Sequence, residues 1–213
     1  MATKNSEIKD RILEIALNDV EFEGWNWDVI ENAAIEAGFE KEMATAVFPE
    51  KIEDVIIHFS DWADRKMLET LNSQDFSGVR IRDKVQAAVW ERLKILKPHK
   101  EAVRKAAAYW VGPTKTPKAA KTLWNSADLI WEWVGDTSED YNFYTKRGLL
   151  VGVMSATTLR WINDQSEDHE DTRAFLARRI DNVLKIGQKA GKVLGKLSPL
   201  LEKFPNWQKK SDH

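Results

Sequence analysis

T-S-E-D-Y-N-F-Y-T-K-R-G-L-L-V-G-V-M-S-A-T-T-L-R-W-I-N, residues 137–163, is a segment whose character changes at its midpoint. Its first half is polar and aromatic, with Asp140, Phe143, Tyr144 and Arg147 at positions i, i+3, i+4 and i+7. A helix places such residues on one side. Residues 148–159 are almost wholly apolar and include small side chains, which suit close packing or a cavity wall. We therefore expect one helix with a surface patch at one end and a buried lining at the other.

Helical periodicity continues along the rest of the chain, and long alternating runs of β-branched residues are absent. The pattern predicts an all-α protein of about ten helices. Ser6 is expected to cap the first helix, Gly38 to end the second, and Pro49 to occupy the first turn of the fourth. The predicted helices cover residues 6–19, 26–37, 40–47, 49–71, 79–96, 98–111, 118–135, 137–163 and 170–189, with an amphipathic segment over 186–204.

Composition limits what the chain can be. Its 213 residues, 43% of them hydrophobic, are enough for one domain with a substantial core. There is no cysteine, which excludes disulfides and thiolate chemistry. The N-terminal residues show neither a signal peptide nor a transit peptide, so we expect a cytoplasmic protein. The longest apolar run, 148–159, is shorter than the roughly 18 residues that cross a bilayer. Any membrane association is therefore expected to be peripheral, at the inner membrane.

Charge is distributed unevenly along the chain. Residues 1–50 contain twelve acidic and four basic side chains, whereas residues 185–210 contain seven lysines and one acidic residue, Glu202. The two ends are therefore expected to meet different partners. The chain also has ten tryptophans, which suit either an ordinary core or the wall of an apolar pocket.

The N-terminal region contains G-W-N-W-D-V-I-E-N-A-A-I-E-A-G-F-E-K-E-M-A-T-A-V-F-P-E-K-I-E-D-V-I at residues 24–56. This order resembles the three-helix, helix-turn-helix-like head of TetR-type regulators. Binding to DNA requires cations that replace counterions along the phosphates. The helix in the recognition position instead offers Glu40, Lys41 and Glu42. We therefore expect a head that does not bind nucleic acid, and a TetR-type ligand-responsive transcriptional regulator is the alternative function.

A second resemblance rests on G-D-T-S-E-D-Y-N-F-Y-T-K-R-G-L-L-V-G-V-M-S-A-T-T-L, residues 135–159, and D-Q-S-E-D-H-E-D-T-R-A-F-L-A-R-R-I-D-N, residues 164–182. Over about residues 122–192 the chain resembles the Coq-nine family of ubiquinone-biosynthesis accessory lipid-binding proteins. The resemblance implies a TetR-like, non-catalytic protein that binds an isoprenoid lipid or quinone precursor. Such a protein presents its ligand at the membrane to a di-iron hydroxylase that acts in ubiquinone (coenzyme Q) biosynthesis.

The resemblances also imply a division of the chain. Residues 1–48 form the helix-turn-helix-like head, residues 49–190 a body for lipid binding and dimerisation, and residues 191–213 a basic amphipathic C-terminal segment. The expected lipid lining comes from the two apolar helices on either side of Gly135, and ordinary core packing is the alternative for each residue. The lining residues are Trp124, Ile130, Trp131, Leu149, Leu150, Val153, Met154 and Thr157.

The aromatic end of segment 137–163 is the expected partner surface. In the family, the matching stretch is implicated in docking the hydroxylase, which points to Asp140, Phe143, Tyr144 and Arg147. The family often has tryptophan at the position of Phe143, so a hydrogen-bond donor is lost here. The alternative is a homodimer contact, because TetR-like proteins usually dimerise through their last two helices, and a homodimer is expected.

The C-terminal segment combines one apolar side with surrounding lysines, which suits an anionic membrane surface. Pro199 interrupts or kinks it. The expected membrane-binding residues are Lys189, Lys192, Val193, Leu194, Lys196, Leu197, Leu201 and Phe204. The alternative is that this segment folds back on the core.

Catalytic motifs are scarce. The four histidines, His58, His99, His169 and His213, are isolated in the sequence, and phosphate-binding loops and nucleophile elbows are missing. Residues 167–171, E-D-H-E-D, are rich in possible metal ligands. Acidic residues at a helix start are favourable without a metal, because they oppose the positive end of the helix. We therefore expect no enzyme activity, no metal and no cofactor. The Coq-nine resemblance implies a bound isoprenoid or phospholipid as the ligand.

Overall fold

A computed structural model describes residues 4–112, 115–138 and 141–183, and within these ranges the chain consists of helices and turns without a β-strand. The predicted all-α class is therefore confirmed. The helices are α1 (Lys4–Glu23), α2 (Trp27–Glu36), α3 (Glu42–Val47), α4 (Ile52–Asn72), α5 (Ile81–Leu96), α6 (Lys100–Tyr109), α7 (Thr116–Trp133) and α8 (Tyr141–Ile162). Two 3₁₀ turns, η1 (Lys97–His99) and η2 (Glu167–His169), and a helix over 170–183 complete the described part.

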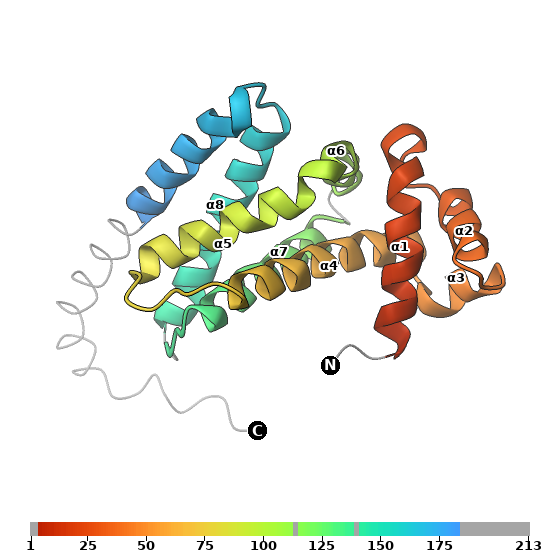
Figure 1. The fold of residues 1–213 in the computed structure, drawn as a ribbon, viewed down its shortest axis with the longest axis horizontal. Coiled ribbons are helices and arrows are strands. Elements are labelled where there is room, and N and C mark those ends of the chain that lie inside the picture. The colour runs from red at the N-terminus through yellow and green to blue at the C-terminus, as the bar shows by residue number, and fades with distance from the viewer. Residues whose placement is uncertain (1–3, 113–114, 139–140, 184–213) are drawn as a thin grey trace, which may run out of the picture.

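Helices α1 to α3 form the head, at one end of the molecule (Figure 1). Helix α1 extends four residues beyond the predicted end and stops where Gly24 adopts φ 83°. Ser6 lies inside α1, so the prediction that it caps this helix is wrong. Asn26 caps α2, because its side chain accepts a hydrogen bond from the Val29 N–H at 3.0 Å. Gly38, with φ 84°, follows the end of α2 as predicted.

Helix α4 begins three residues later than predicted. Pro49 to Lys51 form a turn, in which the Lys51 N–H donates to the Phe48 carbonyl at 2.9 Å. Lys51 itself has φ 52°, a left-handed conformation that interrupts helical geometry. The proline therefore belongs to the turn before α4 rather than to its first helical turn.

The body is built on α4, which packs against α5 and α7, while α7 packs against α8 (Figure 1). Two clusters of buried side chains hold this arrangement together. The first, called the head core, joins α1–α4 to α5, α6 and the end of α8. Its members include Leu13, Ile30, Phe48, Phe59, Leu96, Val103 and Trp161. The head thus shares its core with the body.

The second cluster, called the body core, lies farther from the head. It joins α4, α5, α7, α8 and the helix over 170–183. Its members include Met67, Leu71, Val85, Val89, Ile130, Trp131, Leu150, Val153, Met154, Leu176 and Ile180. Burial of these side chains is the main force that holds the later helices together, at roughly 25 cal/mol per Å² of apolar surface.

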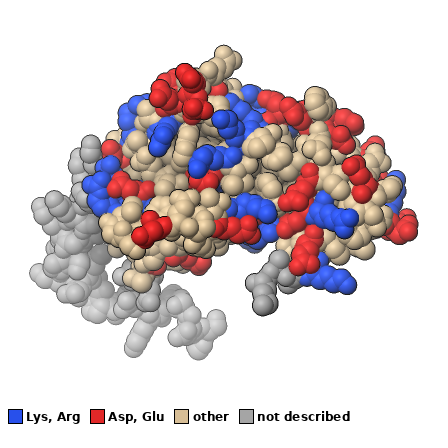
Figure 2. Space-filling view, viewed as in Figure 1, with Lys and Arg blue, Asp and Glu red and all other residues tan. Residues whose placement is uncertain are grey.

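Charged side chains cover the outside of both parts. On the face shown in Figure 2, acidic and basic side chains are interspersed over the head, and no continuous basic surface lies there. Residues 27–47, which include α2 and α3, contain five acidic side chains and one lysine, Lys41. Lys41 is itself paired with Glu31 at 2.8 Å. The position of a DNA-reading helix is thus acidic in the folded protein as well.

Candidate functional site

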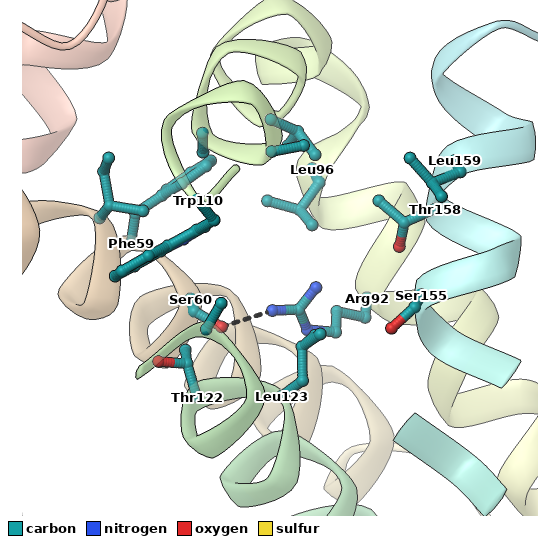
Figure 3. Close-up of a pocket in the computed structure, with 15 residues that line it drawn as sticks. Phe59, Ser60, Arg92, Leu96, Trp110, Thr122, Leu123, Ser155, Thr158 and Leu159 are labelled. Atoms are coloured by element: carbon teal, nitrogen blue, oxygen red, sulfur yellow. Dashed lines mark hydrogen bonds between the residues drawn. The ribbon is translucent and has the colours of Figure 1, made fainter. Parts of the chain in front are cut away.

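An apolar cavity of about 260 Å³ lies beside the head core, among α4, α5, α6, α7 and α8 (Figure 3). Aliphatic and aromatic side chains form most of its wall, with a few hydroxyls and one guanidinium among them. The wall consists of Ile56, Phe59, Ser60, Arg92, Leu96, Val103, Ala106, Ala107, Trp110, Ala119, Thr122, Leu123, Ser155, Thr158 and Leu159. Leu159 is 59% exposed, so the cavity opens to solvent beside it. Such an enclosure suits an apolar ligand.

Small side chains explain why space remains here. Ala106 and Ala107 of α6, Ala119 at the start of α7 and Ser155 of α8 all line the cavity. Protein interiors are otherwise close-packed, so small residues that meet from several helices leave a void which larger ones would fill. The cavity is thus a consequence of side-chain size at positions far apart in the sequence.

The predicted lipid-lining residues lie on other faces of α7 and α8. Ile130, Trp131, Leu150, Val153 and Met154 are members of the body core. Trp131, Leu150 and Val153 border a hollow of only about 30 Å³. The large cavity is lined instead by the sequence neighbours of predicted residues, such as Leu123 beside Trp124 and Ser155 beside Met154.

The three remaining predicted lining residues differ in burial. Thr157 is fully buried, whereas Trp124 and Leu149 are half-buried. The Thr157 hydroxyl and the indole N–H of Trp131 have no hydrogen-bond partner among the described residues. None of the eight predicted residues lines the 260 Å³ cavity.

A buried polar network reaches the cavity through Arg92 and Ser60, which line it. Arg92 of α5 donates from Nε to Asp64 Oδ1 of α4 at 2.6 Å and from Nη2 to Ser60 Oγ at 2.8 Å. The other carboxylate oxygen of Asp64 accepts from the Ser126 hydroxyl of α7 at 2.5 Å. The side chains of Arg92 and Asp64 are only 9% and 4% exposed. Burial of such a pair is tolerated because the opposite charges balance and both side chains make hydrogen bonds.

The predicted partner surface is exposed only in part. Tyr144 is 65% exposed and lies beside Phe143 and Trp124, with ring centroids 5.2 Å and 6.2 Å away. These three residues are called the aromatic surface. Arg147 does not lie on the surface, because it is 2% exposed and its guanidinium is paired with Asp128 and Asp136. Asp140 lies outside the described residues.

Possible metal-binding and catalytic groups are dispersed. No group of three histidine or acidic side chains within the described ranges is arranged to hold a metal ion, including residues 167–171. His58 contacts Asp10 at 2.7 Å, and His99 packs edge-on against Phe59 and Trp62. Burial lowers the pKa of both imidazoles. Their contacts join the head to the body and give no constellation for a reaction.

The expected membrane-binding residues, Lys189, Lys192, Val193, Leu194, Lys196, Leu197, Leu201 and Phe204, all lie outside the described residues. Within the described ranges, no helix has the length and hydropathy needed to cross a bilayer. Membrane attachment through the C-terminal segment therefore stays a prediction.

Comparison with known proteins gives matches along most of the chain. A family model described as COQ9 matches residues 116–187. Proteins named ubiquinone biosynthesis protein COQ9, mitochondrial, from Rattus norvegicus and Homo sapiens are 30% and 28% identical to the chain over 194 residues. These matches cover 88% of this chain and 62% and 61% of the relatives, so the chain spans about three fifths of their length. They confirm the resemblance seen in the sequence.

A solved structure shows the same architecture. The TetR transcriptional regulator from Nitrosomonas europaea superposes with a TM-score of 0.67 and 17% identity, over 84% of this chain and 98% of the regulator. At that identity the likeness concerns the fold alone. The TetR-like fold predicted from residues 24–56 is thereby confirmed.

Proposed function

Because this chain is a relative of the ubiquinone biosynthesis proteins named COQ9, we propose that it is a lipid-binding accessory protein of that pathway. In this proposal the protein is not an enzyme. It takes an isoprenoid quinone precursor from the membrane into its cavity and presents the precursor to a partner hydroxylase.

The 260 Å³ cavity is the observation that carries the proposal. Pockets for small ligands are mostly apolar, with a few polar groups that orient the ligand. A wall of aliphatic and aromatic side chains with a single guanidinium fits that description. An isoprenoid tail would bind chiefly because its apolar surface leaves water, at roughly 25 cal/mol per Å².

The aromatic surface supports the partner half of the proposal. Binding hot spots are enriched in tryptophan and tyrosine, and an exposed Tyr144 beside Trp124 and Phe143 offers such a surface. We assign it to the di-iron hydroxylase of the pathway, with a homodimer contact as the competing use. The basic C-terminal segment is proposed to attach the protein peripherally to an anionic membrane surface.

The alternative function is a ligand-responsive transcriptional regulator, and the TetR-like fold favours it. The acidic character of residues 27–47 opposes it, because phosphate contacts need cations. The two functions predict different ligands: a lipid that purifies with the protein, or a DNA fragment that the protein binds.

The proposal can be tested with a substitution that fills part of the cavity with a larger side chain. Ala107→Phe places a ring in the wall of the cavity, whereas Ala108→Phe makes the same change at the next, exposed position of α6. Each variant is purified from membrane-containing cells, and its organic extract is analysed by mass spectrometry. We expect an isoprenoid lipid with the wild type and with Ala108→Phe, and several-fold less with Ala107→Phe. Equal lipid in both variants, or none in the wild type, would refute the proposal.

A further inference from the structure

Arg92 keeps unused hydrogen-bond donors at the cavity. A guanidinium has five N–H donors. Arg92 donates from Nε to Asp64 and through one Nη2 hydrogen to Ser60. Its Nη1 group has no hydrogen-bond partner among the described residues. Figure 3 shows the guanidinium among the lining side chains, with its bond to Ser60 on one side and Leu96 and Thr158 across the cavity.

Two other hydroxyls of the wall are already used as donors. The Thr122 hydroxyl donates to the Lys118 carbonyl at 2.9 Å, and the Ser155 hydroxyl donates to the Val151 carbonyl at 2.8 Å. Both bonds lie within their own helices. Arg92 is the one cationic residue among those that line the cavity, so a ligand there meets its strongest donor at this guanidinium.

The charge of Arg92 is already balanced. Asp64 lies 2.6 Å from it and is held in turn by Ser126, so the buried pair is neutral as a whole. A carboxylate or phosphate in the cavity would add a negative charge that has no free cation of its own, and unpaired buried charge is costly. A neutral carbonyl oxygen accepts a hydrogen bond from Nη1 and adds no charge.

The size and opening of the cavity set the orientation of such a ligand. Its 260 Å³ is slightly below the roughly 300–1,000 Å³ of pockets that enclose a whole drug-sized molecule. It therefore holds a head group and the first part of a tail, and a longer tail leaves past Leu159, which is both a lining residue and 59% exposed.

From these observations we propose that Arg92 selects the ligand by donating from Nη1 to a neutral carbonyl oxygen on the head of an isoprenoid amphiphile. The Asp64–Ser126 pair holds the guanidinium in place and cancels its charge. This inference rests on the proposed lipid-binding function and adds to it the chemistry of the head group.

The first test compares three probes on the wild-type protein by isothermal titration calorimetry. The probes are a benzoquinone with a geranyl tail, geranylbenzene, and a benzoate anion with the same tail. Hydrogen bonds to charged groups lead us to expect about tenfold tighter binding of the quinone than of geranylbenzene. The benzoate should bind no better than geranylbenzene. Equal binding of all three, or preference for the benzoate, would overturn the inference and leave lipid binding intact; binding of none would overturn the proposed function.

The second test removes the donor without leaving a buried charge. Arg92→Met combined with Asp64→Asn keeps the pair neutral and keeps an acceptor for Ser126. The matched control is Arg82→Met with Asp181→Asn, an ion pair between α5 and the helix over 170–183 that is away from the cavity. We expect the first pair to lose the quinone preference while its affinity for geranylbenzene stays within about twofold. The control should keep the preference.

A quinone preference that survives in the Arg92–Asp64 variant would refute the role of Arg92. If that variant fails to fold, as judged by circular dichroism, the wild-type probe series still decides whether a neutral carbonyl is selected.

Discussion

Arg147 lies in the second turn of α8, with its side chain 3% exposed and paired with two carboxylates. It is paired with Asp128 of α7 and with Asp136, and its guanidinium carbon lies 3.4 Å from the centre of the Phe143 ring. Asp136 is also buried and accepts from Lys146 at 2.6 Å. Arg147 therefore links α8 to α7 and to the turn that follows α7, and its guanidinium packs against the Phe143 ring of the aromatic surface.

We predict that Arg147→Ala lowers the free energy of unfolding by about 3 kcal/mol, because it removes a buried cation from the Asp136 carboxylate, whose side chain is 6% exposed, and from Asp128, whose side chain is 33% exposed. The control is Arg160→Ala on the same helix, whose pair with Asp171 is exposed and should contribute less than about 1 kcal/mol. Urea unfolding of both variants provides the measurement. Equal stability of wild type and Arg147→Ala would show that the arginine does not have this structural role.

At the scale of single elements, Asp164 organises the turn between α8 and the helix over 170–183. One carboxylate oxygen accepts from the Ser166 N–H at 2.8 Å and from its hydroxyl at 2.6 Å. The other accepts from the Thr172 N–H at 2.9 Å and from the Thr172 hydroxyl. Burial alone would raise the pKa of Asp164, but these four hydrogen bonds outweigh it and hold the pKa well below its ordinary value.

A carboxylate whose pKa is lowered by folding stabilises the folded state above the pKa of the unfolded chain, about 3.9, and loses this effect as the pH falls below it. Asp164→Asn should therefore lower the free energy of unfolding by about 1–3 kcal/mol at pH 7. The difference from the wild type should shrink at pH 3. Glu167→Gln, an exposed change in the same turn, is the control for both pH values. A difference that does not depend on pH would contradict this account.

Helix α3 occupies the position that reads DNA in helix-turn-helix proteins, and its surroundings are acidic. We predict that the protein does not retain genomic DNA fragments in a gel-shift assay at low salt, where electrostatic attraction is strongest. The TetR-like fold provides the architecture without the cations. Tight, sequence-specific retention would favour the transcriptional regulator instead.

At the scale of the whole molecule, three histidines couple stability to pH. Burial lowers the pKa of His58, His99 and His169 in the folded protein. His58 and His99 lie where the head meets the body, in contact with Asp10 and with Phe59 and Trp62. Each binds its proton more tightly in the unfolded chain, so protonation favours unfolding.

The sign of the effect follows from the lowered pKa values. Stability should be greatest near neutral pH and should fall as the pH drops below about 6.5, the pKa of an unperturbed histidine. The melting temperature at pH 7 and pH 5 provides the measurement. His99→Phe keeps a ring between Phe59 and Trp62 and removes one titrating group, so its melting temperature should fall less over this range. An unchanged pH dependence in that variant would rule out a contribution from His99.

Local patterns in the sequence were sufficient for the class of the fold and for the approximate positions of the helices, but not for the cap of α1 or the start of α4. The apolar residues of each helix recur at helical spacing, such as Ile130 in α7 and Leu150 and Val153 in α8. The structure buries all three, because an amphipathic helix turns its apolar side inward where it packs. The glycine that follows α2 and the cap at Asn26 are also local features. The acidic character of the head could also be predicted from the sequence, because the number of charged residues in a segment does not depend on tertiary contacts.

Only the tertiary structure decided where the cavity lies and which charged side chains are buried. The wall of the cavity comes from five helices, and its space depends on whether small residues such as Ala107 and Ser155 meet. Periodicity separates buried faces from exposed ones but contains no information on whether a buried face meets a neighbour or a void. Arg147 is buried for the same reason, because its carboxylate partners belong to α7 and the turn after it, and packing of whole helices brings them together.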